Sequence, residues 1–317
     1  MRVLVIGGTG RLGAPVVKHL ARAGNEVIVL TQSGRLPSDA ADAVQAAPGD
    51  AVDRAAVEAA LAGCDAVHVS VSGPAEGPAV ANAVAGAERR GTSLVSYVSG
   101  SATFPEHARF PEIETKLSAE RAIIDSGLRW IILNPSFAME ILPMHVQRGL
   151  ALYFGRQPHP MHWLAADDFG RAVARAYDTE EAREQRLFIR GPEALTVAEA
   201  LRRYCAALHP GISKPRSLPF WLAAAIATVT RDKTSPRRCP PTGCTKAWAG
   251  TAAIPRVPSA CSARRRRRSL RGWHAGRAER PLDRRARCHG SHAAVNGRAR
   301  RGGRWWATRV HSDGRSR

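Results

Sequence analysis

Four glycines fall within seven residues near the start of the chain, in GGTGRLG at residues 7–13. Glycine has no Cβ atom, so its backbone can adopt positive φ and can come close to a bound phosphate. The spacing Gly7-x-x-Gly10-x-x-Gly13 fits two structures: a plain tight turn, or a loop that binds the pyrophosphate of a dinucleotide at a helix N-terminus. The predicted strands and helices around this glycine stretch show which of the two structures fits better.

Apolar runs and amphipathic stretches alternate along residues 1–230. Short apolar runs, typical of strands buried on both faces, lie at 2–6, 27–30, 66–71, 94–98 and 130–133. Apolar residues recur at helical spacing in the segments 12–20, 51–61, 77–90 and 112–126. Strands that alternate with helices predict a Rossmann-like α/β fold with a doubly wound parallel sheet. We expect later elements to pack beside this sheet on the substrate side, at 167–177, 187–189 and 196–208.

The glycine stretch lies between the first predicted strand and the first predicted helix. In a doubly wound sheet, ligands bind at the carboxyl ends of the strands, where the strand order reverses. The first strand-to-helix turn can point helix N–H groups at a pyrophosphate. This context favours the dinucleotide-binding interpretation over a plain turn.

The residues after the second predicted strand bear on which dinucleotide binds. An NAD site usually has Asp or Glu there for the ribose 2′-hydroxyl, but residues 31–35 read Thr-Gln-Ser-Gly-Arg and contain no acid. Arg11 and Arg35 are suited to a 2′-phosphate, and Thr31 ends the strand beside them. The sequence therefore predicts NADP(H) as the preferred cofactor and leaves NAD(H) open. The alternative is that both arginines are solvated surface residues.

Further stretches extend the pattern along the first 230 residues. They are Gly49-Asp50, YVSGSA at 97–102, ETKLSAERAIIDSGLRWIILNPSFAMEI at 114–141, WLAADDFGRAVARA at 163–176 and LFIRGPEALTVAEAL at 187–201. Together with GGTGRLG, this succession resembles the NmrA-like, atypical short-chain dehydrogenase/reductase family. The resemblance covers residues 1–230 only.

The resemblance implies a role for residues along the whole length of a bound cofactor. At the pyrophosphate it places Gly7, Thr9, Gly10, Arg11, Leu12 and Gly13. Near the adenine and the adenosine ribose it places Asp50, Ala51, Ser70, Val71 and Ser72. At the nicotinamide and the substrate side it places Ser99, Lys116, Pro135, Ser136 and Phe137. Of these, Lys116 and Ser99 are the candidate catalytic residues.

Departures from the family pattern affect the expected chemistry. Short-chain dehydrogenases use Tyr-x-x-x-Lys, in which the lysine lowers the tyrosine pKa so that the phenol can exchange a proton with the substrate. Four residues before Lys116 stands Glu112, which we expect to be an ionised carboxylate at a helix start. Tyr97 lies within a predicted strand and is expected in the core. Asn134 stands where many relatives have Arg.

Two functions fit these residues. One is an NADP(H)-dependent reductase that transfers a hydride to a small carbonyl, enone or quinone, since hydride transfer needs only a positioned nicotinamide and an acceptor. The other is a regulator that senses NADP(H) and turns nothing over, which the missing tyrosine supports. The sequence indicates neither a particular substrate nor an oligomeric state.

The net charge of +20 comes entirely from the C-terminal residues. Residues 1–230 contain 23 Lys and Arg against 23 Asp and Glu, whereas residues 231–317 contain 24 against 4. The latter include only six Ile, Leu and Val, too few for a core, so we expect a disordered basic tail. Its mixture of Arg, Gly, Pro, Cys, His and Trp favours a frameshifted or mis-called C-terminus.

Two alternatives for residues 231–317 stay open. The first is a genuine basic tail that binds nucleic acid non-specifically through its arginines. The second is a zinc module with Cys239, Cys244, Cys288, His289 and His292, although their spacing does not repeat a CxxC scheme. Elsewhere in the chain the sequence predicts no metal site.

The sequence indicates neither export nor a membrane. Met1 leads directly into an apolar strand, without the basic and apolar regions of a signal peptide. The longest late apolar run, 219–229, is far shorter than the roughly 20 residues that a bilayer needs. We therefore expect a cytoplasmic protein with no membrane partner, in which Cys64 and Cys205 are buried thiols.

Overall fold

The computed structural model describes residues 1–36, 43–219 and 221. Within these residues, the main sheet has seven parallel strands in the order β11-β6-β5-β4-β1-β2-β3. The strands are β1 (Arg2–Ile6), β2 (Glu26–Thr31), β3 (Val44–Pro48), β4 (Ala66–Val69), β5 (Leu94–Val98), β6 (Arg129–Pro135) and β11 (Gln185–Ile189). The strand order reverses at β1, which lies between β2 and β4. The predicted Rossmann-like, doubly wound fold is therefore confirmed.

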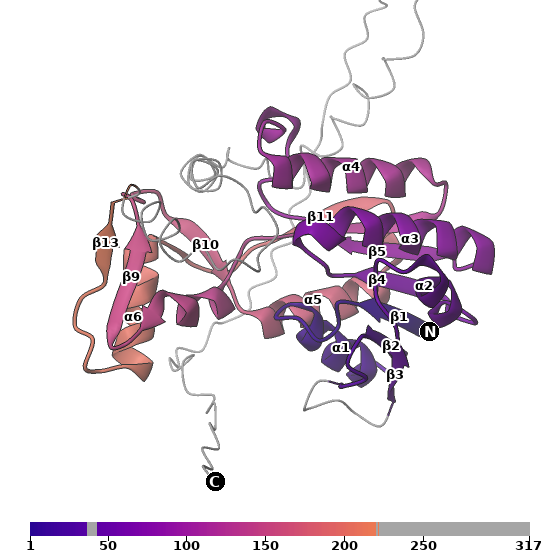
Figure 1. Cartoon of the computed structure of the whole chain (residues 1–317), viewed down its shortest axis with the longest axis horizontal. Helices are drawn as coiled ribbons and strands as arrows, with labels where there is room; N and C mark the ends of the chain where they lie inside the picture. Colours follow the sequence, from indigo (N-terminus) through magenta and orange to yellow (C-terminus); the bar gives the residue numbers. More distant parts are fainter. Residues whose placement is uncertain (37–42, 220, 222–317) are drawn as a thin grey trace, which may run out of the picture. The chain divides into compact units, whose positions relative to one another are not determined.

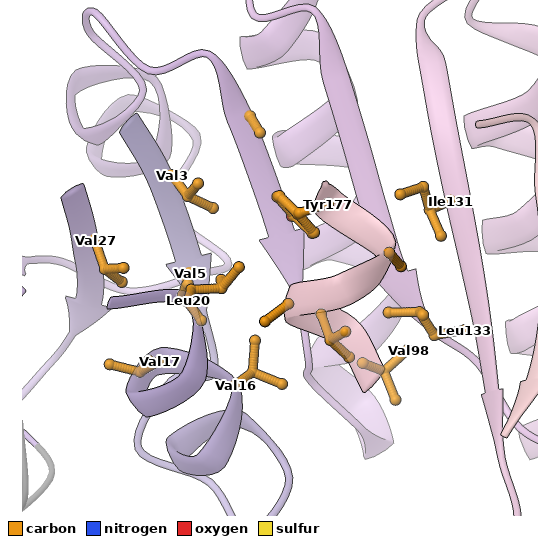
Figure 2. Packing of buried hydrophobic residues seen from close by; sticks show 14 of the residues in the cluster. Val3, Val5, Val16, Val17, Leu20, Val27, Val98, Ile131, Leu133 and Tyr177 are labelled. Carbon is orange, nitrogen blue, oxygen red and sulfur yellow. The ribbon is translucent and has the colours of Figure 1, made fainter. Parts of the chain in front are cut away.

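Helices cover both faces of this sheet (Figure 1). Successive side chains of a strand point to opposite faces, so β1 contributes Val3 and Val5 to one core and Leu4 and Ile6 to the other. Figure 2 shows the first core, which α1 and α5 cover, with Tyr177 of α5 among its members. The second core packs against α2, α3 and α4. These helices are α1 (Gly13–Arg22), α2 (Arg54–Ala60), α3 (Glu76–Arg90), α4 (Pro111–Asp125) and α5 (Ala166–Tyr177).

Local sequence sets several helix ends. Asp53 caps α2 by accepting a hydrogen bond from Ala55 N (2.9 Å), so this helix starts later than the expected residue 51. Pro111 occupies the first turn of α4, as expected. The capping box expected at Thr196 and Glu199 is confirmed, because each side chain accepts from the other's backbone N–H (3.2 and 3.0 Å).

Short elements follow β6. They form two three-stranded sheets, β12-β10-β7 and β13-β9-β8, and α6 contacts both of them. A third core lies here around Trp163, whose side chain is fully buried. The elements are β7 (Phe137–Ala138), β8 (Val146–Gln147), β9 (Leu150–Phe154), β10 (Met161–Leu164), β12 (Ala194–Leu195), β13 (Arg216–Leu218), α6 (Val197–Leu208) and the 3-10 helices η3 (Met139–His145) and η4 (Glu180–Ala182). Two further 3-10 helices, η1 (Gly73–Ala75) and η2 (Pro105–His107), come before β6 in the chain.

Two strands differ from their expected positions. Residues 187–189 were expected beside the sheet, but β11 pairs in parallel with β6 and belongs to the sheet itself. The reason is that Leu187 and Ile189 pack against the first core, so this strand buries an apolar face. The strand expected at 66–71 ends at Val69, because its partner β1 ends at Ile6.

Some expectations concern residues that the structure does not describe. The predicted boundary at 230/231, the basic tail at 231–317 and its cysteines lie outside the described residues. Cys64 and Cys205 are free and buried, as expected. None of the helices within the described ranges has the length and apolar character that a membrane span requires.

Candidate functional site

The glycine stretch forms a tight turn between β1 and α1. Gly10 N donates to Gly7 O (3.0 Å), and Ala14 N donates to Gly10 O (2.9 Å). Gly7 has φ +83°, and a Cβ atom there would overlap the carbonyl of Ser70 at the end of β4. A Cβ atom at Gly13 would overlap the carbonyl of Gly7. Glycine is therefore required at both positions by the close approach of backbone to backbone.

The N-terminus of α1 is open to an anion. Its N-cap residue, Leu12, has no side chain that could accept a hydrogen bond, and the first turn of α1 contains no acidic residue. The first N–H groups of a helix have no partner within the helix and carry the positive end of the helix dipole. A phosphate at this position would supply the acceptors that the side chains do not. The exposed Arg11 adds a positive charge beside the turn.

The end of β2 adjoins the glycine stretch, because β1 and β2 pair with Ile6 opposite Leu30. Thr31 is buried, with its hydroxyl 3.3 Å from Ser33 Oγ. Arg35 N donates to Ser33 Oγ (3.3 Å), and the side chain of Arg35 is exposed. No acid stands between residues 31 and 35.

The residues expected near the adenosine lie at the ends of β3 and β4. The carboxylate of Asp50 accepts from Val52 N (3.1 Å), and the carbonyl of Ala51 accepts from Asn82 Nδ2 (3.1 Å). Ser70 N donates to the carbonyl of Ile6 (2.9 Å), which ties the end of β4 to the glycine stretch. The remaining residues expected here, Val71 and Ser72, follow directly in the chain. These strand ends all belong to one edge of the parallel sheet.

We call the group Ser99, Lys116, Pro135 and Phe137 the predicted nicotinamide end. Pro135 ends β6, and its carbonyl accepts from Ser101 N (3.1 Å). Phe137 is half-buried, and its ring centroid is 6.2 Å from that of Trp163.

Two neighbouring polar side chains contact loop backbone. Ser136 Oγ accepts from Gly191 N (3.3 Å). Asn134 Nδ2 donates to Gly100 O (2.9 Å), and this hydrogen bond ties β6 to the loop after Ser99.

Ser99 is buried, and its hydroxyl donates to the carboxylate of Glu120 (Oε1, 2.5 Å). The hydroxyl of Thr103 lies 3.1 Å from the same Ser99 oxygen. Glu120 is fully buried on α4, and a guanidinium nitrogen of Arg186 is 2.5 Å from its other carboxylate oxygen. The hydroxyl hydrogen of Ser99 is thus directed at a carboxylate.

Lys116 is held by a second buried carboxylate. Its Nζ donates to Glu76 Oε1 (2.5 Å), and Tyr97 OH donates to the same oxygen (2.5 Å). Tyr97 is fully buried, as expected of a core residue, and burial together with the adjacent Glu76 carboxylate raises its pKa well above the usual range. Tyr97 therefore stays protonated and acts as a donor to Glu76.

Glu112 is exposed in the first turn of α4, in keeping with the expected helix-start carboxylate. Sequence reasoning missed Glu76 and Glu120, since an acid in a helix is no signal of a buried partner. In the part of the chain that the structure describes, no group of three His, Cys, Asp or Glu side chains is arranged to hold a metal ion. Asp167 instead joins α5 to α1, accepting from Lys18 Nζ (2.8 Å).

A family model described as NAD(P)H-binding matches residues 7–142. A (4-alkanoyl-5-oxo-2,5-dihydrofuran-3-yl)methyl phosphate reductase from Streptomyces griseus is 32% identical over 208 residues, which cover 62% of this chain and 70% of the relative. The chain belongs to the NmrA-like, atypical short-chain dehydrogenase/reductase family. An NAD(P)H azoreductase from Xenophilus azovorans is 27% identical over 220 residues, which cover 67% of this chain and 74% of that protein.

Solved structures of two reductases share the fold. The triphenylmethane reductase of Citrobacter sp., complexed with NADP(H), matches with a TM-score of 0.62 at 18% identity, over 82% of this chain and 93% of that chain. An NADPH-dependent quinone oxidoreductase from Escherichia coli, complexed with NADPH, matches with a TM-score of 0.60 at 18% identity, over 78% and 90%. Residues 7–142 of this chain thus form an NAD(P)H-binding domain, as the sequence indicates.

Proposed function

We propose that this chain is an NADP(H)-dependent reductase that transfers a hydride to a small carbonyl, enone or quinone. The observation that carries the proposal is the glycine stretch, in which backbone occupies the space of a Cβ atom at Gly7 and Gly13. It opens a helix whose N-terminus no side chain caps. The relatives named as an NAD(P)H azoreductase and a (4-alkanoyl-5-oxo-2,5-dihydrofuran-3-yl)methyl phosphate reductase support reduction as the reaction.

The proposed chemistry needs little from the protein beyond positioning. NADPH, when bound, supplies the hydride. A quinone takes up this hydride to give the hydroquinone anion, which takes one proton from solvent water as it leaves the site, and NADP+ is the other product. In this proposal Lys116 binds the hydroxyls of the nicotinamide ribose, and Pro135 and Phe137 line the nicotinamide and exclude water. No step requires the tyrosine that Glu112 replaces.

Arg11 and Arg35 are proposed to select NADP(H) over NAD(H). Both side chains are exposed at the edge where β1 and β2 end, and no acid competes for them between residues 31 and 35. Guanidinium groups bind phosphates through paired, charge-assisted hydrogen bonds. Replacing Arg35 by Gln should weaken NADPH binding about tenfold and leave NADH binding nearly unchanged, whereas Arg11→Gln should weaken the binding of both nucleotides, because Arg11 also lies at the turn proposed to hold their pyrophosphate.

A second function is supported by a specific observation. The Ser99 hydroxyl donates to Glu120 and the Tyr97 hydroxyl donates to Glu76, so neither is directed at a substrate. A protein that binds NADP(H) without a proton donor can act as a sensor of the nucleotide. This regulator is the alternative to the reductase.

One experiment tests both functions. The full chain is titrated with NADPH and with NADH by ligand fluorescence, and NADPH oxidation is then followed with a quinone and with an enone. Preferential NADPH binding with quinone-dependent oxidation supports the reductase. Binding without oxidation of NADPH by any acceptor favours the regulator. Folded protein that binds neither nucleotide contradicts both.

A further inference from the structure

Three elements of the fold meet at the ammonium group of Lys116. Glu76 is the first residue of α3, Tyr97 lies on β5, and Lys116 lies one turn into α4. The Glu76 side chain is 3% exposed and that of Lys116 is 18% exposed, so the ion pair between them is largely shielded from water. Lys116 Nζ also lies 5.8 Å from the centroid of the Tyr97 ring. The ammonium group is thus bounded by a carboxylate and by an aromatic ring.

A buried ion pair needs an explanation other than stability. Removing two charges from water costs about as much as their attraction returns, so an apolar pair of similar size would often stabilise a fold as well. Lysine has a long, flexible side chain, and an unrestrained one loses much conformational freedom when it binds a ligand. A carboxylate that already holds the ammonium removes part of that loss.

Tyr97 fixes the carboxylate in turn. Both Tyr97 OH and Lys116 Nζ donate to the same oxygen, Glu76 Oε1, at 2.5 Å. The Tyr97 ring is fully buried in the second core, so the position of its hydroxyl is set by packing. The position of Glu76 Oε1 follows from that of the hydroxyl, and the position of the lysine follows from Glu76.

The chain connects Glu76 to the other end of the site. Residues 70–72, expected beside the adenosine ribose, lead through the 3-10 helix Gly73–Ala75 directly into Glu76. We propose that Glu76 is a positioning residue: it holds Lys116 where this side chain binds the nicotinamide ribose, with Tyr97 orienting the carboxylate. The inference rests on the proposed function, since it assigns Glu76 a role in binding the same nucleotide.

The positioning role has a signature that a merely structural role lacks. Glu76→Gln keeps the size of the side chain and an oxygen that can accept both hydrogen bonds, but it removes the charge that attracts Lys116. The affinity for NADPH should fall about tenfold. The affinity for adenosine 2′,5′-bisphosphate, which has no nicotinamide ribose, should not change. Tyr97→Phe keeps the ring and should cause a smaller loss of about threefold, again for NADPH alone.

The test is a double-mutant cycle in the full chain, with nucleotide affinities from fluorescence or calorimetry. If Glu76 acts through Lys116, Glu76→Gln has no further effect on NADPH affinity in a Lys116→Met background. Glu114→Gln is the control, because Glu114 is an exposed carboxylate of the same helix and should change neither affinity. Melting temperatures show which variants fold, and Tyr97→Phe decides the question if Glu76→Gln does not fold.

The outcomes separate this inference from the proposed function. Additive losses in the cycle, or equal losses for NADPH and the bisphosphate, would overturn the positioning role of Glu76. So would a folded Glu76→Gln or Tyr97→Phe variant with wild-type affinity for NADPH. Failure of the unaltered chain to bind NADPH would instead reject the proposed function itself.

Discussion

Two hydroxyl groups near the predicted nicotinamide end donate to buried carboxylates. Ser99 donates to Glu120 and Tyr97 donates to Glu76, and each carboxylate also contacts a basic side chain. A hydroxyl has one hydrogen, so a hydroxyl that donates to a carboxylate has none left for a substrate. Reduction of a ketone needs a positioned acid, whereas a quinone takes its proton from water. The residues therefore favour the quinone among the proposed acceptors.

Gly7 offers a test of the glycine stretch with a matched control. Gly7 and Gly24 share the same φ of +83°, but only at Gly7 would a Cβ atom meet other atoms, since nothing lies within 4 Å of that position at Gly24. Both Ala substitutions carry a backbone cost of about 1 kcal/mol. Gly7→Ala should also displace Ser70 and reduce NADPH affinity at least about tenfold.

The control and the measurement follow from that difference. Gly24→Ala should lower the free energy of unfolding by about 1 kcal/mol and leave NADPH affinity unchanged. Fluorescence titration and urea unfolding of both variants measure the two effects. Unchanged affinity in a folded Gly7→Ala variant would show that the turn does not bind the nucleotide.

His68 predicts a dependence of stability on pH. It is fully buried on β4, its Nδ1 lies 2.8 Å from Ser96 Oγ, and burial lowers its pKa to about 3. Ser96 also contacts the hydroxyl of Tyr177, whose pKa burial raises above the usual range, so this neighbour stays neutral. The unfolded chain binds a proton at His68 below about pH 6.5, whereas the folded chain does not.

The contribution of neutral His68 to stability is therefore complete above about pH 6.5 and is lost progressively as the pH falls from there to about 3, the pKa in the folded chain. At pH 5 the loss should be about 2 kcal/mol relative to neutral pH. Urea unfolding at both pH values should show this loss in the unaltered chain and a smaller one in His68→Gln, which cannot take up the proton. His159 is exposed, so His159→Gln should keep the full loss. An equal loss in His68→Gln would contradict the assignment.

At the scale of elements, α1 and α5 pack closely at Gly170. A Cβ atom there would lie 2.5 Å from Pro15 O and 3.0 Å from His19 Cδ2. Ala has a higher helix propensity than Gly by about 1 kcal/mol, but forcing the two helices apart costs about 1–3 kcal/mol. Gly170→Ala should therefore lower the free energy of unfolding, and chemical denaturation measures it.

Gly77 in α3 is the control for Gly170. The nearest atom to a Cβ at Gly77 is Thr115 Cγ2 at 4.0 Å, so the substitution meets no resistance. Gly77→Ala should leave stability unchanged or raise it by up to about 1 kcal/mol. If Gly170→Ala proved as stable as Gly77→Ala, the close packing of α1 on α5 would not hold in solution.

The inner strands could be predicted from the sequence because strands buried on both faces appear as continuous apolar runs. The same pattern misled at Ser70 and Val71, since an apolar alternation continues after the partner strand β1 has ended. It also gave no signal for β7, β8 and β12, which have two residues each. Membership of β11 in the sheet depends on its pairing with β6, a contact that local sequence does not encode.

In the candidate site, too, the features with a local sequence signal could be predicted and those set by long-range contacts could not. The turn at residues 7–13 was predictable, because glycine spacing and a preceding strand are both local signals. The carboxylates that hold Lys116 and Ser99 were not, because Glu76 and Glu120 lie 40 and 21 residues away from them in the chain. In sequence, Glu76 has the appearance of an acid at a helix start, where it would favour the helix dipole.

For the whole molecule, the charge distribution predicts that nucleic acid and NADPH bind to different parts of the chain. The described elements belong to a neutral segment, residues 1–230, whereas residues 231–317 carry the entire net charge of +20. Arginine binds nucleic acid phosphates by charge alone, which requires no selected sequence and weakens steeply with salt. Nucleotide binding, in contrast, is proposed to depend on residues between 7 and 137.

Deletion of residues 231–317 should therefore abolish DNA binding and leave NADPH binding intact. The full chain should bind a labelled DNA duplex at about 50 mM salt and release it at several hundred millimolar, and the shortened chain should not bind at either salt concentration. NADPH affinity should be the same for both within about twofold. Fluorescence anisotropy measures the first and a nucleotide titration the second, with circular dichroism to check that both chains fold. A folded, shortened chain that no longer binds NADPH would show that the nucleotide site requires residues beyond 230.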